Sequence, residues 1–241
     1  MNIDQRSEPS AQYCREIEAY LCRKNDGHLI RIVGPAFEQV SGWMARGVPL
    51  KVACAGIDRY FDRYYAKGPR RRPVRIEFCE ADILDLFDDW RRAVGVGAVA
   101  GNNAADADVV STRRHGGLAA HLDRAVARLT ALRSGPERPL DGFIDDVVRE
   151  LDGARAGAKA IRGENRERLL ARLRALDEQL LIAARSEFDE RALRELAGEA
   201  DAELQPFRER MPFEAYERSR RACIDRLIRE RLRLPTLAFE P

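Results

Sequence analysis

Apolar residues recur at spacings of three and four along most of the chain, and this period predicts an all-α fold. The N-terminal helices are expected at about 11–24, 35–46, 49–66 and 79–93. The Asn-Asp-Gly sequence at 25–27 ends the first of them, because these residues favour turns. The β-branched segment HLIRIVG that follows predicts either a strand or a buried connector.

Beyond residue 112 the chain is rich in Arg, Glu, Leu and Ala, and its pattern predicts helices alone. They are expected at 118–133, 140–151, 166–184, about 189–205 and about 213–233. Within the third of these, Leu169, Leu173, Leu176 and Leu180 keep the alternating spacing of a heptad seam, over too short a stretch to establish a coiled coil. The favoured architecture for this part is an antiparallel helical bundle.

The composition of the chain changes between these two parts. Residues 95–112, GVGAVAGNNAADADVVST, are small and lack a hydrophobic period, which is typical of a flexible linker. Aromatic residues are concentrated before this segment. We therefore expect an N-terminal helical domain at 11–94, a linker at 95–112 and a C-terminal helical domain at 113–241.

The chain has 241 residues, of which 45% are hydrophobic and 34% charged, values typical of a globular protein. It contains no run of about 20 apolar residues, so we expect no membrane-spanning helix. The first ten residues, MNIDQRSEPS, lack the basic and apolar regions of a secretory signal. These features favour a cytoplasmic protein.

The sequence carries few signals of a catalytic, metal or cofactor site. The phosphate-binding pattern GxxxxGK[ST] and the dinucleotide pattern GxGxxG are both absent. The five cysteines, at 14, 22, 54, 79 and 223, form no CxxC pair, so we expect free thiols and neither zinc nor an iron–sulfur cluster. We predict no cofactor, no metal and no catalytic residue.

Two further groups of residues have side chains capable of chemistry. Asp85 and Asp89 share one predicted helix face, where two carboxylates can bind a divalent cation or divide acid and base roles. The stronger interpretation is that the acidic residues of 77–89 face solvent or the positive end of a helix. His115 and His121 are six residues apart and so do not share a face, which favours solvated or capping roles over catalysis.

The most suggestive charge feature lies between Lys51 and Arg75, where eight basic residues and two acidic ones give a net charge of +6. Arginine binds phosphates through a planar fork, and the interleaved Tyr60, Tyr64 and Tyr65 can stack on unpaired bases. The predicted nucleic-acid-binding residues are Arg59, Arg63, Lys67, Arg70, Arg71, Arg72 and Arg75. A second basic run at 218–233 is a weaker candidate for the same role.

The bias of the whole chain supports a plainer interpretation of both basic runs. Of its 42 basic residues only four are lysines, a skew that is typical of a GC-rich genome. Such a bias places arginine at any solvated helix position. Both basic runs are therefore also open to interpretation as ordinary solvated faces.

A family resemblance supports the interpretation that the first basic run binds nucleic acid. A helix with Trp43 before Gly47, a following helix PLKVACAGIDRYF, a basic loop and a short apolar helix together resemble the DnaD-like domain of bacterial primosome proteins. The resemblance covers residues 35–90, and the loop is longer and more basic than is usual in that family.

The best-known motif of that family is a Tyr, three residues, Ile-Leu and an aromatic residue three further on. Here Ile83, Leu84 and Phe87 match, Cys79 stands at the Tyr position, and Phe78 lies one residue earlier. The resemblance implies DNA binding and remodelling in helicase loading or replication initiation. It also implies that the three matching residues belong to the motif.

The first hypothesis is therefore a non-enzymatic, DNA-associated protein that binds the nucleic-acid backbone, without base-specific reading, through its basic loop. Its C-terminal helices would recruit a protein partner or a second copy. The second hypothesis is an interaction or scaffold protein that assembles through the helices at 164–184 and 213–233 and does not bind nucleic acid. The third is an enzyme that uses the carboxylates or the two histidines.

Overall fold

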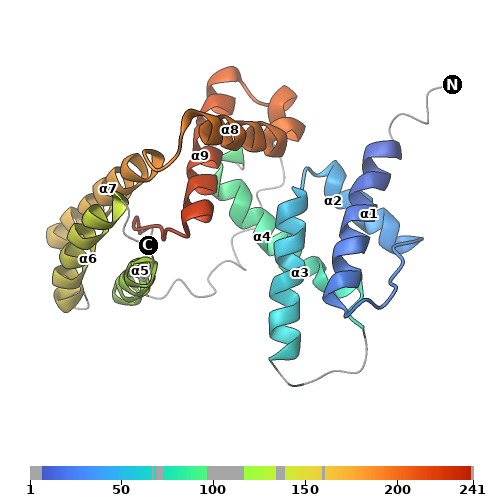
Figure 1. Cartoon of the computed structure of the whole chain (residues 1–241), viewed down its shortest axis with the longest axis horizontal. Helices are drawn as coiled ribbons and strands as arrows, with labels where there is room; N and C mark the ends of the chain where they lie inside the picture. The colour runs from blue at the N-terminus through green and yellow to red at the C-terminus, as the bar shows by residue number, and fades with distance from the viewer. Residues whose placement is uncertain are drawn as a thin grey trace. The chain divides into compact units, whose positions relative to one another are not determined.

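The computed structural model describes residues 7–66, 68, 73–96, 117–133, 139–158 and 161–239. The chain divides into two compact units. Figure 1 colours the chain by residue number, from blue at the N-terminus to red at the C-terminus. Unit 1 consists of Met1–Ala100 and Glu203–Ser219, and unit 2 consists of Gly101–Ala202 and Arg220–Pro241. Over the described ranges every regular element is a helix, which confirms the all-α prediction. None of the helices described is long and apolar enough to cross a membrane.

The described part of unit 1 before residue 97 is built on four α-helices whose apolar stripes meet in one core. They are α1 (Ser7–Lys24), α2 (Pro35–Ala45), α3 (Leu50–Tyr65) and α4 (Glu80–Ala93), with a short 3-10 helix, η1 (Ile76–Cys79), before the last. Ile17, Trp43, Ile57 and Ile83, one from each α-helix, are fully buried. The predicted periodicity therefore identified the inward face of each helix.

The segment 28–34 contains no strand, and its backbone is held by side chains of α1. The N–H of Ile30 donates to Cys22 Sγ at 3.3 Å, and the N–H of Ile32 donates to Glu18 Oε2 at 2.7 Å. Because these groups already have partners, the segment needs no neighbouring strand. It is an irregular connector in which Ile32 is buried while Leu29 is exposed.

Unit 1 also includes residues that the sequence pattern assigned to the C-terminal domain. The 3-10 helix η3 (Gln205–Arg210) places the ring of Phe207 5.8 Å from that of Trp90. The indole N–H of Trp90 donates to Glu203 at 3.0 Å. The expected boundary of 113–241 therefore differs from the compact units, because buried aromatic contacts join 203–219 to unit 1. Of the expected linker, residues 97–112 lie outside the described residues.

Unit 2 contains α5 (Leu118–Leu132), α6 (Pro139–Gly157) and α7 (Gly163–Arg185), most of α8 (Glu190–Leu204), and α9 (Phe213–Leu232) from Arg220 onward. Arg133 at the end of α5 pairs with Asp145 of α6 at 2.6 Å, while Arg155 near the end of α6 reaches Asp123 of α5 at 3.3 Å. These crossed pairings require α5 and α6 to run antiparallel.

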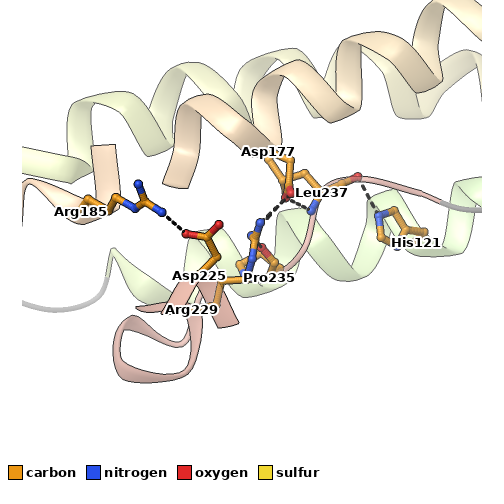
Figure 2. A network of polar contacts seen from close by, with 7 residues as sticks. All are labelled: His121, Asp177, Arg185, Asp225, Arg229, Pro235 and Leu237. Atoms are coloured by element: carbon orange, nitrogen blue, oxygen red, sulfur yellow. Dashed lines mark hydrogen bonds and ion pairs between the residues drawn. The ribbon is translucent and has the colours of Figure 1, made fainter. Parts of the chain in front are cut away.

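The C-terminal segment of unit 2 is fixed by a polar network (Figure 2). Asp177 of α7 accepts hydrogen bonds from Arg229 Nη2 at 2.6 Å, from Arg229 Nη1 at 3.1 Å and from the N–H of Leu237 at 2.6 Å. His121 Nε2 lies 3.0 Å from the carbonyl oxygen of Leu237. The Asp177 carboxylate is almost buried, so these donors replace its lost hydration.

Candidate nucleic-acid interface

The described part of the predicted basic cluster lies on α3 and directly before η1, and its geometry begins with the packing of α3 on α4. Gly56 of α3 faces Ile83 of α4 so closely that an added Cβ would lie 2.6 Å from the Cα of Ile83. Only glycine allows this approach. The approach brings the side chains that follow Gly56 on α3 over the first turn of α4.

Arg59 and Arg63 meet the same carboxylate there. Arg63 donates to both oxygens of Asp82, Nη1 to Oδ1 at 2.8 Å and Nη2 to Oδ2 at 2.7 Å. Arg59 Nε lies 3.4 Å from Asp82, and its Nη2 lies 3.7 Å from Asp85. The side chain of Asp82 is 3% exposed. We name this group the Asp82 clasp.

The Asp82 clasp changes what its arginines can do. The hydrogen bonds from Arg63 to Asp82 raise the pKa of the guanidinium above its ordinary value, so Arg63 stays charged. The charge of Arg63 is paired with the nearly buried carboxylate of Asp82. An unpaired charge at that depth would destabilise the fold. The structure therefore brings these two predicted binding residues together in a structural contact between α3 and α4.

The charge of the basic cluster lies mainly in the chain between α3 and η1. Residues 64–76 contain Lys67, Arg70, Arg71, Arg72 and Arg75 and no acidic residue, and we name this stretch the basic segment. Its first four basic residues lie outside the described residues. Arg75 is exposed and donates to Glu77 at 2.6 Å.

Both ends of the basic segment belong to the core of unit 1. One end is the last turn of α3, and the other is Val74, which is buried. Asn25, itself buried, accepts from the N–H of Val74 at 2.7 Å and donates to its carbonyl at 3.1 Å. A further bond from Asn25 to the carbonyl of Leu21, at 2.9 Å, ties this end to α1. Asn25 was predicted only as a helix stop.

Aromatic rings line the same end of α3. Tyr60 and Tyr64, one helical turn apart, stack with centroids 5.7 Å apart, and Phe78 of η1 stacks on Tyr60 at 6.4 Å. We name these three rings the ring column. Phe78 is 57% exposed. In the sequence, Phe78 stands out only by its position one residue before the Tyr position of the family motif, and it is not among the predicted binding residues.

The three family-motif residues pack inward. Ile83 is fully buried against Gly56, Phe87 is buried and stacks on Trp90 with centroids 5.8 Å apart, and Leu84 is half-buried. Their packing in unit 1 explains why these three residues are apolar. A direct contact with DNA would need side chains that reach the surface.

The remaining candidate residues that the structure describes are engaged in structural contacts. Asp85 lies near Arg59, and Asp89 accepts from Arg92 at 2.5 Å. His121 contacts the C-terminal segment, and His115 lies outside the described residues. Within the described ranges, no three His, Cys, Asp or Glu side chains are grouped to hold a metal ion. All five cysteines are free thiols.

The second basic run is largely neutralised inside unit 2. Arg220 pairs with Asp201 at 2.6 Å and Arg229 with Asp177 at 2.6 Å, and two further arginines of α9 also pair with glutamates. In α7, the seam residues Leu173, Leu176 and Leu180 are buried in the unit's own core. Three of the four seam leucines of the helix at 164–184, a helix proposed to mediate assembly, are thus buried within the chain, while Leu169 is half-buried.

Comparison with known proteins returned no match: no family model, no curated protein and no solved structure matches this chain.

Proposed function

We propose that this chain is a non-enzymatic, DNA-associated protein that binds the nucleic-acid backbone through the basic segment of unit 1. One observation carries the proposal. The Asp82 clasp pairs Arg59 and Arg63 with carboxylates of α4. Residues 64–76 contain five basic residues and no acidic one, and of these five Arg75 pairs with Glu77 from outside the stretch.

The anchoring of the basic segment supports this assignment. Its ends are fixed by α3 and by the hydrogen bonds between Asn25 and Val74. A charged segment with fixed ends offers its arginines to a ligand within a limited volume, which reduces the entropy lost on binding. Arginines in such a segment form hydrogen-bonded pairs with phosphates and release counterions from the nucleic acid.

The test is the salt dependence of DNA affinity, measured by fluorescence anisotropy with a labelled mixed-sequence oligonucleotide. The wild-type affinity is expected to fall steeply as salt rises. Replacing Arg70, Arg71 and Arg72 together with Ala is expected to flatten the log–log slope by about two to three units. The absence of wild-type binding at low salt would refute the proposal.

A charge-matched control separates the basic segment from the arginine excess of the whole chain. Arg124, Arg128 and Arg174 are exposed helix positions in unit 2. Their triple replacement with Ala removes the same charge and is expected to leave the slope unchanged. Equal flattening by both triple variants would mean that general charge, and not the basic segment, drives binding.

The role in replication initiation or helicase loading belongs to the same proposal and rests on the resemblance of residues 35–90 alone. Its test is a pull-down with a purified replicative helicase as the defined partner. Capture that survives nuclease treatment is the expected result. Capture lost on nuclease treatment would restrict the proposal to DNA binding.

A further inference from the structure

We infer that the ring column is a stacking platform that makes the interface prefer single-stranded over double-stranded nucleic acid. The inference rests on the proposed function, and it concerns which form of nucleic acid the basic segment serves. It is carried by the geometry of Tyr60, Tyr64 and Phe78 and by the covalent connection of these rings to the basic segment.

The rings form an ordered stack. The planes of Phe78 and Tyr60 differ by 14°, and those of Tyr60 and Tyr64 differ by 22°. The guanidinium of Arg63 lies 5.5 Å from the centroid of Tyr60, at cation–π distance. Because Arg63 is also held by Asp82, the clasp helps to fix the middle ring of the column.

One end of the ring column is closed and the other is open. At the closed end, Tyr65 meets Tyr64 edge-on with centroids 5.4 Å apart, and Phe61, a buried core residue, contacts Tyr65 at 5.8 Å. At the other end, Phe78 is the last ring, and more than half of its surface faces solvent. The exposed surface of Phe78 is the place where a flat apolar ligand would extend the stack by one member.

Chain connectivity keeps the positive charge close to this stack. Lys67 follows Tyr64 by three residues, and Arg75 precedes Phe78 by three. Even a fully extended chain covers only about 11 Å over three residues. The sequence therefore keeps the first and last basic residues of the basic segment within three residues of a ring of the column.

A site for single-stranded nucleic acid needs positive charge for the phosphates, close to aromatic rings on which the bases can stack. An unpaired base offers a free face for stacking on an aromatic side chain, whereas a paired base in a duplex is stacked on its neighbours. Stacking of this kind tolerates any base, in agreement with the absence of base-specific reading from the proposed function. Single-stranded DNA and single-stranded RNA share this chemistry.

The experiment uses the full chain and three labelled probes of one mixed sequence: single-stranded DNA, single-stranded RNA and duplex DNA. Wild type is expected to bind a single strand more tightly than the duplex. Phe78→Ala is expected to weaken single-strand affinity about 5- to 150-fold, the range for loss of one base–aromatic stack. Duplex affinity and the salt slope should stay unchanged, because no charge is removed.

Two control variants test whether the loss of affinity is specific to stacking at Phe78. Phe213→Ala removes a phenylalanine that is 79% exposed on α9 and should leave all three affinities unchanged. Phe78→Trp retains a stacking face and should preserve single-strand binding. Because Phe78 is exposed, Phe78→Ala is expected to keep the wild-type circular dichroism spectrum, which is checked first.

Each outcome decides the inference. Equal weakening of single-strand and duplex binding by Phe78→Ala, or no weakening, would overturn the stacking platform and leave the proposed function standing. A preference for the RNA strand would support the platform and contradict the DNA assignment. Wild type that binds none of the probes would overturn both the inference and the proposed function.

Discussion

The close approach of α3 to α4 makes Gly56→Ala the most informative test of the fold beneath the interface. A Cβ on residue 56 would lie 2.4 Å from Ile83 Cγ1, 2.6 Å from its Cα and 2.8 Å from its backbone nitrogen. A side-chain atom can rotate away, but the backbone atoms of α4 cannot. Ordinary contact begins near 3.4 Å, so the two helices must move apart by about 0.8 Å at this point.

The size of the effect follows from two opposing contributions. Overpacking of a close helix contact lowers the free energy of unfolding by about 3 kcal/mol at the upper end of its usual range. Ala in place of Gly within a helix raises it by about 1 kcal/mol. We therefore expect Gly56→Ala to lower the free energy of unfolding of unit 1 by about 2 kcal/mol. The Asp82 clasp spans the same two helices, so the variant is also expected to loosen it.

The assay is urea unfolding followed by tryptophan fluorescence. The only tryptophans, Trp43 and Trp90, are both buried in unit 1 and therefore report on that unit. The matched control is Gly42→Ala in α2, where an added Cβ meets no atom within 4 Å. It is expected to raise stability by about 0.5–1 kcal/mol. If Gly56→Ala is as stable as the wild type or more stable, the close packing of α3 on α4 is refuted.

Three further predictions concern the two units. Asp82→Ala removes the carboxylate that Arg59 and Arg63 share and should destabilise unit 1 by about 2 kcal/mol. The effect is smaller than for a fully buried pair because both arginines reach solvent. An unchanged urea midpoint would contradict this prediction. Burial raises the pKa of Cys54 to about 11 and that of Cys79 to about 12. The unfolded chain ionises these thiols near their ordinary pKa while the folded chain keeps them protonated, so the urea midpoint of unit 1 should fall as pH rises from about 9 to about 11; a midpoint that rises instead would refute the sign. Asp177→Ala removes the carboxylate partner of the nearly buried Arg229, which keeps only its hydrogen bond to the carbonyl oxygen of Pro235 among these contacts. The variant should cost unit 2 about 3 kcal/mol, visible in far-ultraviolet circular dichroism while the tryptophan fluorescence transition stays in place.

The helices could be predicted from sequence because each buries one periodic stripe. The last predicted helix, at about 213–233, matches α9 within one residue at each end. The first begins at Ser7, before the predicted start near residue 11, because the first turn of a helix needs no buried residue. Phe207 had no such signal, since an aromatic residue alone between two prolines has no period, and only its contact with Trp90 places it in unit 1.

The candidate site was only partly predictable for a similar reason. The excess of basic residues was visible in the sequence, but the division of that charge was not. Asp82 and Arg63 are 19 residues apart, and their pairing depends on the approach of α3 to α4 at Gly56. Asp82 was interpreted as a helix-dipole residue, and no local pattern distinguishes that role from a nearly buried ion-pair partner.

The central claim is that the basic cluster divides into structural arginines and arginines that bind phosphate. The most direct test compares the salt slope of DNA affinity for two single variants, Arg63→Ala and Arg71→Ala, after both are shown to be folded. Loss of Arg71 should lower the slope by about 0.7–0.9, the value of one phosphate contact. Loss of Arg63 should leave the slope at its wild-type value, because that charge is already paired with Asp82. A slope that falls for Arg63→Ala and stays constant for Arg71→Ala would contradict the division.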